Sequence, residues 1–392
     1  MDGARCSKQL PGRLSRRRAL AAMGGLVATA WLAACGGDDE STEADPVAVA
    51  SPTAVPKLYP VEQYGAAGDG VTDDAAAFQA AIDVASAEGG GIVQLSGAAY
   101  LLDAPVFVFG TGITLAGVPG STRLIAGPGL FHTDVFTVRA GSFTARDLWF
   151  DMAPNGGHDH ASRALNFRND AAPIENILIE RIRVDHAERA GIRTEGTSQP
   201  VVHGRVIDCV FNDCRAPIAL DYLVEDWEIS GNEIVAPWGD GGISVDLLTA
   251  PRRARRLNIT GNTIVNSLVP SGGGQGAIRG RMIDSVIANN TISVGPGGFA
   301  GIRLSAGQGN RVTGNVISRI GERAGTGIEA FAEVATSIEQ NEVRDFSIGL
   351  VTDDNSRNLA ISGNDLVANT TPVRIAGSGH TLSNNTGVSG SS

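Results

Sequence analysis

The sequence predicts an all-β fold, a right-handed parallel β-helix with a capping helix at its N-terminal end. Two observations support this prediction. A short motif built around Asn returns at intervals of 23 to 30 residues between Asn232 and Asn364, and a short apolar strand pattern lies between its copies. A repeat of this length cannot bury its apolar face alone, so successive repeats are expected to stack as the coils of a solenoid.

Residues 1–34 are predicted to be an export signal rather than part of the fold. The segment Ser15-Arg16-Arg17-Arg18-Ala19-Leu20 resembles a twin-arginine signal, although Ala19 stands where Phe is usual, and an apolar stretch follows. This stretch ends in Leu32-Ala33-Ala34-Cys35, which resembles a lipobox. The resemblance implies lipidation of Cys35 and an exported lipoprotein, anchored to a membrane at the cell surface or in the periplasm. A plain secretory signal is the alternative.

Residues 35–58 are predicted to be a flexible linker, because an acidic, polar run is followed by Pro46, Pro52 and Pro56. The β-helix domain then spans residues 59–392. Without residues 1–34 the chain keeps 25 basic and 41 acidic residues, a formal charge of −16. Nucleic acid is therefore excluded as the main partner, because phosphate binding needs a basic face.

The domain opens with Tyr64-Gly65-Ala66-Ala67-Gly68-Asp69-Gly70-Val71-Thr72-Asp73-Asp74, in which Thr72 is expected to cap a helix. Apolar residues then recur at helical spacing, at Phe78, Ala81, Ile82 and Ala85. This block resembles the start of the pectate-lyase-like and epimerase-like β-helix superfamily, in which such a helix closes the end of the solenoid. The resemblance implies that Asp69, Asp73 and Asp74 are structural.

The Asn motif consists of a small residue, Asn, a variable residue and an apolar residue. Its copies and three degenerate versions are Arg146–Trp149, Glu180–Arg183, Asp208–Phe211, Gly231–Ile234, Gly261–Ile264, Asn289–Ile292, Gly314–Ile317, Gln340–Val343 and Gly363–Leu366. Asn tolerates a left-handed bend between strands, and stacked amides can hydrogen-bond from one coil to the next. The Asn residues are therefore expected to form an internal ladder.

A short apolar strand recurs between the copies of the Asn motif, as at Gly191-Ile192-Arg193. In each copy the residue equivalent to Ile192 is expected to point into the core, and the next residue is expected to point outward. One outward column is predicted to comprise Arg193, Ala219, Ser244, Arg279, Arg303, Glu329 and Val351. The neighbouring column is predicted to comprise Glu195, Asp221, Asp246, Arg281, Ser305, Phe331 and Asp353. Parallel stacking places successive members about 4.8 Å apart.

This spacing predicts that Asp221 and Asp246 are adjacent carboxylates. Such a pair can bind calcium, or act as acid and base on a glycosidic bond. Asp221, Asp246 and Arg279 are therefore the candidate catalytic residues. Arginines hold carboxylates bidentately, and the candidate substrate-binding residues are Arg193, Glu195, Arg281, Arg303, Glu329 and Asp353. The alternative is a solvated ladder in which Arg and acidic side chains satisfy one another.

The segment Ile218–Val224 resembles the segment that carries a catalytic Asp in mannuronan C5-epimerases, and Asp221 matches that Asp. Those enzymes carry Tyr-Gly-Phe-Asp-Pro-His one coil earlier. This chain has Ala190-Gly191-Ile192-Arg193-Thr194-Glu195 there, without the Tyr, Asp and His. The polygalacturonase motifs are not found either, so the resemblance implies a fold and a groove rather than a reaction.

The favoured hypothesis is a polysaccharide lyase or glycoside hydrolase that acts on an acidic, uronate-containing polysaccharide. The alternative is a non-catalytic polysaccharide-binding or surface-structural β-helix. Calcium is the candidate cofactor. Weaker candidate sites are His158-Asp159-His160, Asp185-His186 and the basic loop Arg252–Arg256. Cys209 and Cys214 are either a disulfide or two small buried side chains.

Overall fold

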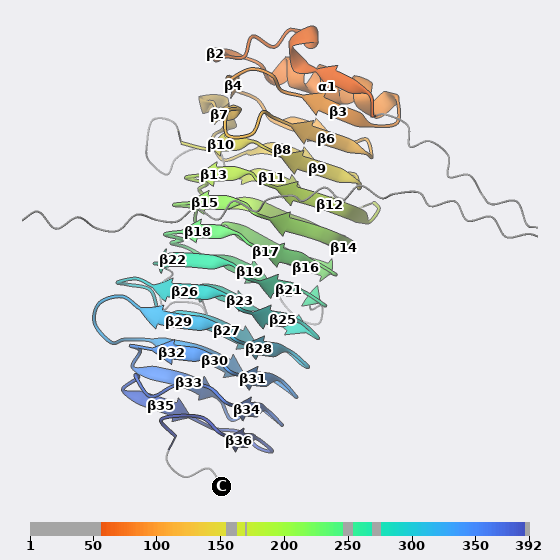
Figure 1. Ribbon diagram of the computed structural model, residues 1–392. Coiled ribbons are helices and arrows are strands. Elements are labelled where there is room, and N and C mark those ends of the chain that lie inside the picture. Colours follow the sequence, from red (N-terminus) through yellow and green to blue (C-terminus); the bar gives the residue numbers. More distant parts are fainter. Residues whose placement is uncertain (1–55, 154–162, 169–170, 246–253, 269–275, 389–392) are drawn as a thin grey trace, which may run out of the picture. The chain divides into compact units, whose positions relative to one another are not determined.

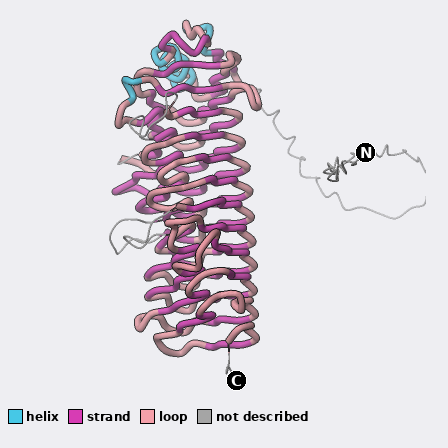
Figure 2. The backbone as a smooth tube through the Cα atoms, turned by 90° about the vertical axis from the view of Figure 1, so that its left-hand side faces the viewer, coloured by secondary structure: helices cyan, strands magenta, loops and turns pink. Residues whose placement is uncertain are grey.

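The computed structural model describes residues 56–153, 163–168, 171–245, 254–268 and 276–388. These residues form a stack in which each strand pairs in parallel with the equivalent strand of the next coil (Figure 1). The backbone trace winds through successive coils along one axis (Figure 2). The all-β parallel β-helix that the repeats predict is therefore confirmed. Within the described ranges, no helix is both long and apolar enough to cross a membrane.

One side of the stack is an 11-stranded sheet, to which each coil contributes one strand. Its strands are β2 (Asp69–Asp73), β4 (Ala99–Leu102), β7 (Arg123–Ala126), β10 (Trp149–Asp151), β13 (Arg183–Asp185), β15 (Val210–Asn212), β18 (Glu233–Val235), β22 (Thr263–Ser267), β26 (Thr291–Val294), β29 (Val316–Arg319) and β32 (Glu342–Arg344). The described part of the solenoid therefore has about 11 coils.

A 25-stranded sheet forms the other two sides, because strands such as β14 (Ala190–Ile207) continue from one side to the next. We call the first of these sides the arginine face. Besides the first half of β14 it contains β5 (Val106–Val108), β8 (Asp134–Val138), β11 (Arg163–Phe167), β16 (Ile218–Glu225), β19 (Ile243–Val245), β23 (Ile278–Gly280), β27 (Ala300–Ser305), β30 (Thr326–Phe331), β33 (Ile348–Thr352) and β35 (Thr371–Arg374).

The second of these sides contains the other half of β14, and short strands lie at the corner between the two. Its strands are β1 (Leu58–Pro60), β3 (Gly91–Gln94), β6 (Ile113–Ala116), β9 (Phe143–Arg146), β12 (Ile174–Glu180), β17 (Glu228–Ser230), β21 (Asn258–Thr260), β25 (Val286–Ala288), β28 (Arg311–Thr313), β31 (Ser337–Glu339), β34 (Ala360–Ser362) and β36 (Thr381–Ser383). The corner strands are β20 (Ala254–Arg255) and β24 (Met282–Ile283).

The core of the arginine face is a column of stacked isoleucines. The strand register aligns six of them in consecutive coils, namely Ile192, Ile218, Ile243, Ile278, Ile302 and Ile328. All six are fully buried. Because each coil buries its apolar side chains against the coils before and after it, burial fixes the strand register. The register in turn decides which side chains point outward on this face.

The predicted N-terminal helix is α1 (Ala75–Ala87), and its four predicted apolar positions are all buried. It packs against β1, β3, β5 and β6 at the N-terminal end of the stack (Figure 1). The predicted cap at Thr72 is wrong, because Thr72 lies in β2 and the helix begins after Asp74. The carboxylate of Asp74 instead accepts hydrogen bonds from the amides of Ala67 and Gly68, at 2.6 and 3.2 Å. The described residues also contain two short 3-10 helices, η1 (Val61–Tyr64) and η2 (Pro128–Leu130).

The Asn ladder is confirmed. In each step the side-chain Nδ2 donates to the Oδ1 of the next Asn at 2.8 to 3.0 Å, and the ladder runs through Asn232, Asn262, Asn290, Asn315, Asn341, Asn364 and Asn385. All seven residues are buried. Each Nδ2 also donates to a backbone carbonyl, as that of Asn290 does to Ile259 at 2.9 Å. The Asn side chains therefore form hydrogen bonds with backbone groups at a turn, and these groups would otherwise be left unpaired.

Two details of the predicted motif are wrong. The left-handed backbone belongs to the residue before each ladder Asn, for example Gly231 with φ 67°. In the first degenerate copies the alignment is shifted by one residue. Asp147 and Arg181, with φ of 59° and 50°, occupy that left-handed position, and Leu148 and Ile182 occupy the ladder position.

Cys209 and Cys214 are free and buried in the core. Burial raises the pKa of both thiols to about 12. The backbone amide of Cys209 donates to Oδ1 of Asn232 at 3.0 Å, so Cys209 occupies the ladder position one coil earlier. In this structure both cysteines are therefore small core side chains.

Candidate functional site

The outward column that begins at Arg193 lies as the strand alternation predicts. The register pairs each member with the next, through Arg193, Ala219, Ser244, Arg279, Arg303, Glu329 and Val351. In the neighbouring column Glu195 pairs with Asp221, and Ser305 pairs with Phe331. Asp246 lies outside the described residues, so the structure does not place the predicted Asp221–Asp246 pair.

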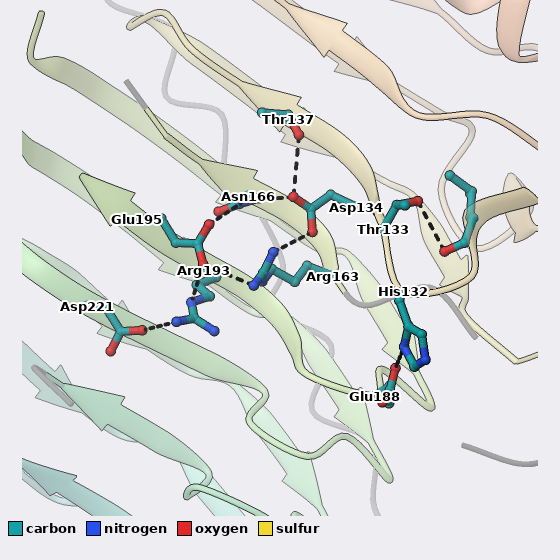
Figure 3. Close-up of polar contacts among 11 residues, drawn as sticks. His132, Thr133, Asp134, Thr137, Arg163, Asn166, Glu188, Arg193, Glu195 and Asp221 are labelled. Atoms are coloured by element: carbon teal, nitrogen blue, oxygen red, sulfur yellow. Dashed lines mark hydrogen bonds and ion pairs between the residues drawn. The ribbon is translucent and has the colours of Figure 1, made fainter. Parts of the chain in front are cut away.

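A continuous chain of ion pairs crosses β8, β11, β14 and β16 of the arginine face (Figure 3). Arg163 contacts Asp134 at 2.8 Å and Glu195 at 3.0 Å. Arg193 contacts the same carboxylate of Glu195 at 3.1 Å and that of Asp221 at 3.0 Å. We call these five residues the charge ladder. It joins three carboxylates to two guanidiniums, which leaves one formal negative charge in excess.

Asn166 lies between two carboxylates of the charge ladder, those of Asp134 and Glu195. Its Nδ2 donates to Asp134 at 2.7 Å and to Glu195 at 3.0 Å (Figure 3). These two acceptors fix the orientation of the amide, because only its nitrogen can donate. By bonding to both, Asn166 fixes the positions of the Asp134 carboxylate on β8 and the Glu195 carboxylate on β14 relative to each other.

The position of Asp221 differs from that expected of a substrate-facing acid. Its side chain has no exposed surface, whereas Arg193 keeps 20% of its side chain exposed. Backbone contacts also hold this part of β16, since Thr194 Oγ1 donates to the carbonyl of Asp221 at 2.9 Å. In this arrangement Asp221 orients Arg193, and Arg193 is the group that reaches the surface.

A cavity of about 210 Å³ opens beside Arg193. Its lining residues are Arg189, Arg193, Arg215, Ala216, Ala219 and Asp240. Three of them are equivalent in consecutive coils, because Arg189, Arg215 and Asp240 each stand three residues before a paired core isoleucine. The buried alanines Ala216 and Ala219 pack together with Ala190 at the bottom. The cavity exists because these side chains are too small to fill the space between the arginines.

Among the residues that line the cavity, guanidiniums outnumber carboxylates. Arg189, Arg193 and Arg215 contribute three guanidiniums, and Asp240 is the one carboxylate in the lining. Asp240 offsets part of this charge, because its Oδ2 lies 3.5 Å from Nε of Arg215. Guanidinium groups match a planar carboxylate in both charge and geometry. The arrangement can therefore hold a small anionic group such as the carboxylate of an acidic sugar.

Farther along the column, Arg279 and Arg303 pair directly with each other in register. Burial lowers the pKa of Arg279. Arg303 donates to Glu329 at 2.6 Å, and its guanidinium carbon lies 5.0 Å from the centre of the Phe331 ring. Burial nevertheless raises the pKa of Glu329 above its ordinary value. Glu329 is thus the partner of Arg303 rather than an open carboxylate.

The remaining predicted binding residues lie apart from the cavity lining. Arg281 directly follows the last residue of β23. Asp353 accepts hydrogen bonds from the Ala332 amide and the Ser356 hydroxyl, both at 2.7 Å. Burial opposes ionisation of Asp353, but these bonds hold its pKa below its ordinary value. Asp353 therefore stabilises a turn.

A larger cavity, of about 510 Å³, lies on the second side of the stack around His203, Trp227 and Arg256. Its charged groups neutralise one another. Arg256 contacts Asp226 at 2.6 Å, and Arg205 contacts Glu228 at 2.9 Å. Size alone therefore does not make it the better anion site.

The described residues contain no group of three or more His, Cys, Asp or Glu side chains placed to hold a metal ion. His158-Asp159-His160 lies outside the described ranges. Asp185 is buried, and it accepts hydrogen bonds from Trp149 at 2.8 Å and from Nε of Arg183 at 2.8 and 3.0 Å. Its role is therefore structural. Of the arginines in the basic loop, Arg255 and Arg256 are described, and Arg256 donates hydrogen bonds to Asp226 and Glu225.

Sequence reasoning missed the residues that border the cavity before each strand, namely Arg189, Arg215 and Asp240. The strand period applies only within strands, and these three residues lie in the turns that lead into them. The signal was present, because counting back three residues from each core isoleucine brings these residues into one column. Asp134, Arg163 and Asn166 were missed because the outward columns were predicted only from Arg193 and Glu195 onward.

Comparison with known proteins identifies relatives of this chain. The model of the family described as "Rhamnogalacturonase A/epimerase, pectate lyase-like" matches residues 59–351. Mannuronan C5-epimerase AlgE6 of Azotobacter vinelandii is 31% identical over 192 residues, which are 44% of this chain and 21% of that protein. AlgE4 of the same organism is 31% identical over 183 residues, 43% of this chain and 32% of that protein. The chain thus covers a third or less of each relative.

Solved structures share the fold at low identity. The A-module of AlgE6 has a TM-score of 0.51 and 18% identity, over 83% of this chain and 98% of that chain. DFA-IIIase from Arthrobacter chlorophenolicus A6, in complex with GF2, has a TM-score of 0.53 and 14% identity, over 78% and 94%. PfbA, a surface adhesin of Streptococcus pneumoniae, has a TM-score of 0.52 and 15% identity, over 84% and 94%. At these identities the likeness shows the fold alone.

Proposed function

Because the chain belongs to the rhamnogalacturonase A/epimerase family of pectate lyase-like proteins, we propose that it acts on an acidic, uronate-containing polysaccharide bound on the arginine face. The observation that carries the proposal is the cavity beside Arg193, with three guanidiniums around an alanine floor. The relatives named mannuronan C5-epimerases add support, because mannuronan is itself a polymer of an acidic sugar.

In this proposal Arg193 binds the sugar carboxylate, and Arg189 and Arg215, which line the same cavity, contribute further positive charge. Asp221 and Glu195 are positioning residues, because both carboxylates contact Arg193. Neutralising a uronate carboxylate makes the adjacent C5 proton easier to remove, which favours cleavage by β-elimination. Asp246 and Arg279 stay the candidate groups for proton transfer. Asp240 joins them, because it lines the cavity and keeps 31% of its side chain exposed.

The test of this proposal is a product assay. The protein is incubated with polymannuronate, polygalacturonate and hyaluronan, and both unsaturated sugars and new reducing ends are followed. A lyase produces both signals together, whereas a hydrolase produces reducing ends alone. Turnover of no polymer, at any pH from 4 to 9, would contradict the enzymatic part of the proposal.

A second function, polysaccharide binding without cleavage, is favoured by one observation. Asp221, which matches the epimerase Asp in sequence, is fully buried and paired with Arg193. A buried, ion-paired carboxylate is poorly placed for general acid or base work, which requires reach to the reacting proton. Saturable binding of a polyuronate with no products in the same assay would select this function.

We further propose that the chain is exported and anchored by lipid at Cys35. The support is the order of the arginine pair, the apolar stretch and the Leu32–Cys35 segment in the sequence. A lipid anchor would hold the β-helix at a membrane surface.

A further inference from the structure

The turn that leads into β19 packs on the turn that leads into β16, one coil earlier. The backbone amides of Gly239 and Asp240 both donate to the carbonyl of Arg215, at 2.9 and 3.2 Å. The indole Nε1 of Trp238 donates to the carbonyl of Asp213 at 3.4 Å. We call Trp238, Gly239 and Asp240 the cavity turn. Its backbone fixes the point from which the Arg215 side chain extends into the cavity lining.

The cavity turn also holds the side chain of Arg215. A Cβ on Gly239 would clash with Cγ of Arg215, so the aliphatic part of that side chain lies directly against the glycine. The backbone of Gly239 has no positive φ, so the contact requires the missing side chain and not a special backbone conformation. The guanidinium carbon of Arg215 lies 5.9 Å from the centre of the Trp238 ring, which is within the range of a cation–π contact. Gly239 and Trp238 therefore position Arg215 without contributing any charge.

Asp240 interacts with guanidiniums of the coils on both sides of it. Its Oδ2 lies 3.5 Å from Nε of Arg215, in the coil before. In the coil after, burial lowers the pKa of Arg279, and the charge of Asp240 acts against this effect. The distance to Arg215 is longer than the about 2.7–2.9 Å of a charge-assisted hydrogen bond. The side chains of Arg215 and Asp240 are 44% and 31% exposed. An ion pair with this spacing and exposure is weak.

We propose that Asp240 competes with the ligand carboxylate for Arg215, and that the ligand displaces it from this arginine on binding. The inference rests on the proposed function and adds the group that limits the affinity of the cavity. Asp240 is the one carboxylate among the lining residues, beside three guanidiniums. A ligand carboxylate in the cavity repels Asp240, which keeps Arg279 as a cationic partner. Gly239 and Trp238 meanwhile keep Arg215 in place.

A purely supporting role for Asp240 predicts the opposite effect of its removal. If Asp240 were needed to hold Arg215, Asp240→Asn would loosen this arginine and weaken binding. If Asp240 competes with the ligand, the same substitution removes the competitor while Gly239 and Trp238 still position Arg215, and binding becomes tighter. The sign of the change in affinity therefore separates the two roles.

The experiment is a calorimetric titration of polygalacturonate or polymannuronate, whichever the wild type binds more tightly. Affinity is measured rather than turnover, because Asp240 is also a candidate for proton transfer. The variants are Asp240→Asn, Gly239→Ala and each of these combined with Arg215→Ala. Asp240→Ser is measured as well, in case the amide is not tolerated, and thermal unfolding checks the fold of every variant.

Two matched controls accompany these variants. Glu228→Gln removes a carboxylate that is 37% exposed and paired with an arginine on the second side. It therefore changes the net charge as Asp240→Asn does, at a site outside the cavity lining. The methyl ester of the same polymer is the ligand control, because it has the same sugar and linkage without the charge.

Asp240→Asn and Asp240→Ser should bind the polyuronate about threefold to tenfold more tightly than the wild type does. The gain should be absent with the methyl ester and smaller in the Arg215→Ala background, because Asp240 then has no Arg215 to compete for. Gly239→Ala should weaken binding of the polyuronate, and it should have no further effect once Arg215 is Ala. Glu228→Gln should bind as the wild type does.

Unchanged or weaker binding by the Asp240 variants overturns the inference and leaves the proposed function intact. So does an equal gain in Glu228→Gln or in the Arg215→Ala background, because the gain would then reflect net charge alone. A Gly239→Ala protein that binds as tightly as the wild type also overturns it, since Arg215 would not depend on the cavity turn. A wild type that binds neither polyuronate contradicts the proposed function, and the inference with it.

Discussion

The Nη2 atom of Arg193 lies 3.0 Å from Oδ2 of Asp221, a residue of the next coil whose side chain is completely buried. The two residues are diagonal neighbours, since Arg193 pairs with Ala219 and Asp221 pairs with Glu195. Arg193 is thus held from both sides, by Glu195 at 3.1 Å and by Asp221. A long side chain that is fixed before a ligand arrives loses less conformational entropy on binding.

The first prediction concerns Asp221. We expect Asp221→Asn to lower the free energy of unfolding by about 2 kcal/mol, because it removes the buried carboxylate charge that pairs with the guanidinium of Arg193. We also expect weaker polyuronate binding, since Arg193 is then held by Glu195 alone. Urea unfolding and calorimetric titration measure the two effects. The control is Asp226→Asn, which breaks ion pairs of a partly exposed Asp on the second side and should change stability by less than about 1 kcal/mol. Equal effects in both variants would show that Asp221 has no special role.

The second prediction concerns the Asn ladder. Asn315→Leu should destabilise the protein by about 1–3 kcal/mol, because it leaves the amide of Asn290 and the carbonyl of Ile287 without their partner. The same holds for Asn290→Leu. Urea unfolding tests it against Asn258→Leu, an exposed position of β21. If the ladder variants and the control have the same midpoint, the ladder does not stabilise the fold.

The third prediction concerns pH. Burial raises the folded-state pKa of Glu329 above its ordinary value of 4.5, so the folded protein holds this proton more tightly than the unfolded chain does. The stability that Glu329 contributes is then fully present below pH 4.5 and is lost as pH rises through the raised pKa. We expect the wild type to lose stability relative to Glu329→Gln over this window.

The control for this prediction is Glu228, whose pKa Arg205 holds below its ordinary value. Its contribution is lost as pH falls, so the difference between the wild type and Glu228→Gln should have the opposite slope. Unfolding free energies at several pH values between 3 and 7 give both slopes. Slopes of the same sign would mean that burial does not control the ionisation of Glu329.

The fourth prediction concerns Cys35, which lies outside the described residues. Cys35→Ala should move the protein from the membrane fraction to the soluble fraction, and the wild type should incorporate labelled fatty acid at this residue. Cys209→Ala serves as the control, since Cys209 is a core side chain. Unchanged fractionation together with an unlabelled wild type would exclude the anchor.

The periodicity of the sequence was sufficient to predict the fold and the outward columns. A period of two fixes which way each side chain points, and the register then follows from burying isoleucine on isoleucine. The copies around Asp147 and Arg181 were aligned one residue off because their ladder positions hold Leu148 and Ile182. An apolar side chain there fills the same space without forming amide hydrogen bonds, so the Asn that marks the position is missing.

The candidate site was predictable only in part. Alternation placed Asp221 on the outward side of β16, but the direction of a side chain does not say what covers it, and Asp221 is buried. Arg189, Arg215 and Asp240 belong to turns, where no strand period applies. They come together because their coils stack in register, and this depends on the length of every turn between them.

The central claim is that the cavity beside Arg193 binds the carboxylate of an acidic polysaccharide. The most direct test is a calorimetric titration of polymannuronate and polygalacturonate into the wild type, Arg193→Ala and Arg205→Ala, the last being an arginine paired with Glu228 on the second side. The account predicts that Arg193→Ala loses at least about tenfold in affinity, that Arg205→Ala binds as the wild type does, and that added salt weakens binding to the wild type more than to Arg193→Ala. Equal affinities of the wild type and Arg193→Ala for every polyuronate that binds would contradict it.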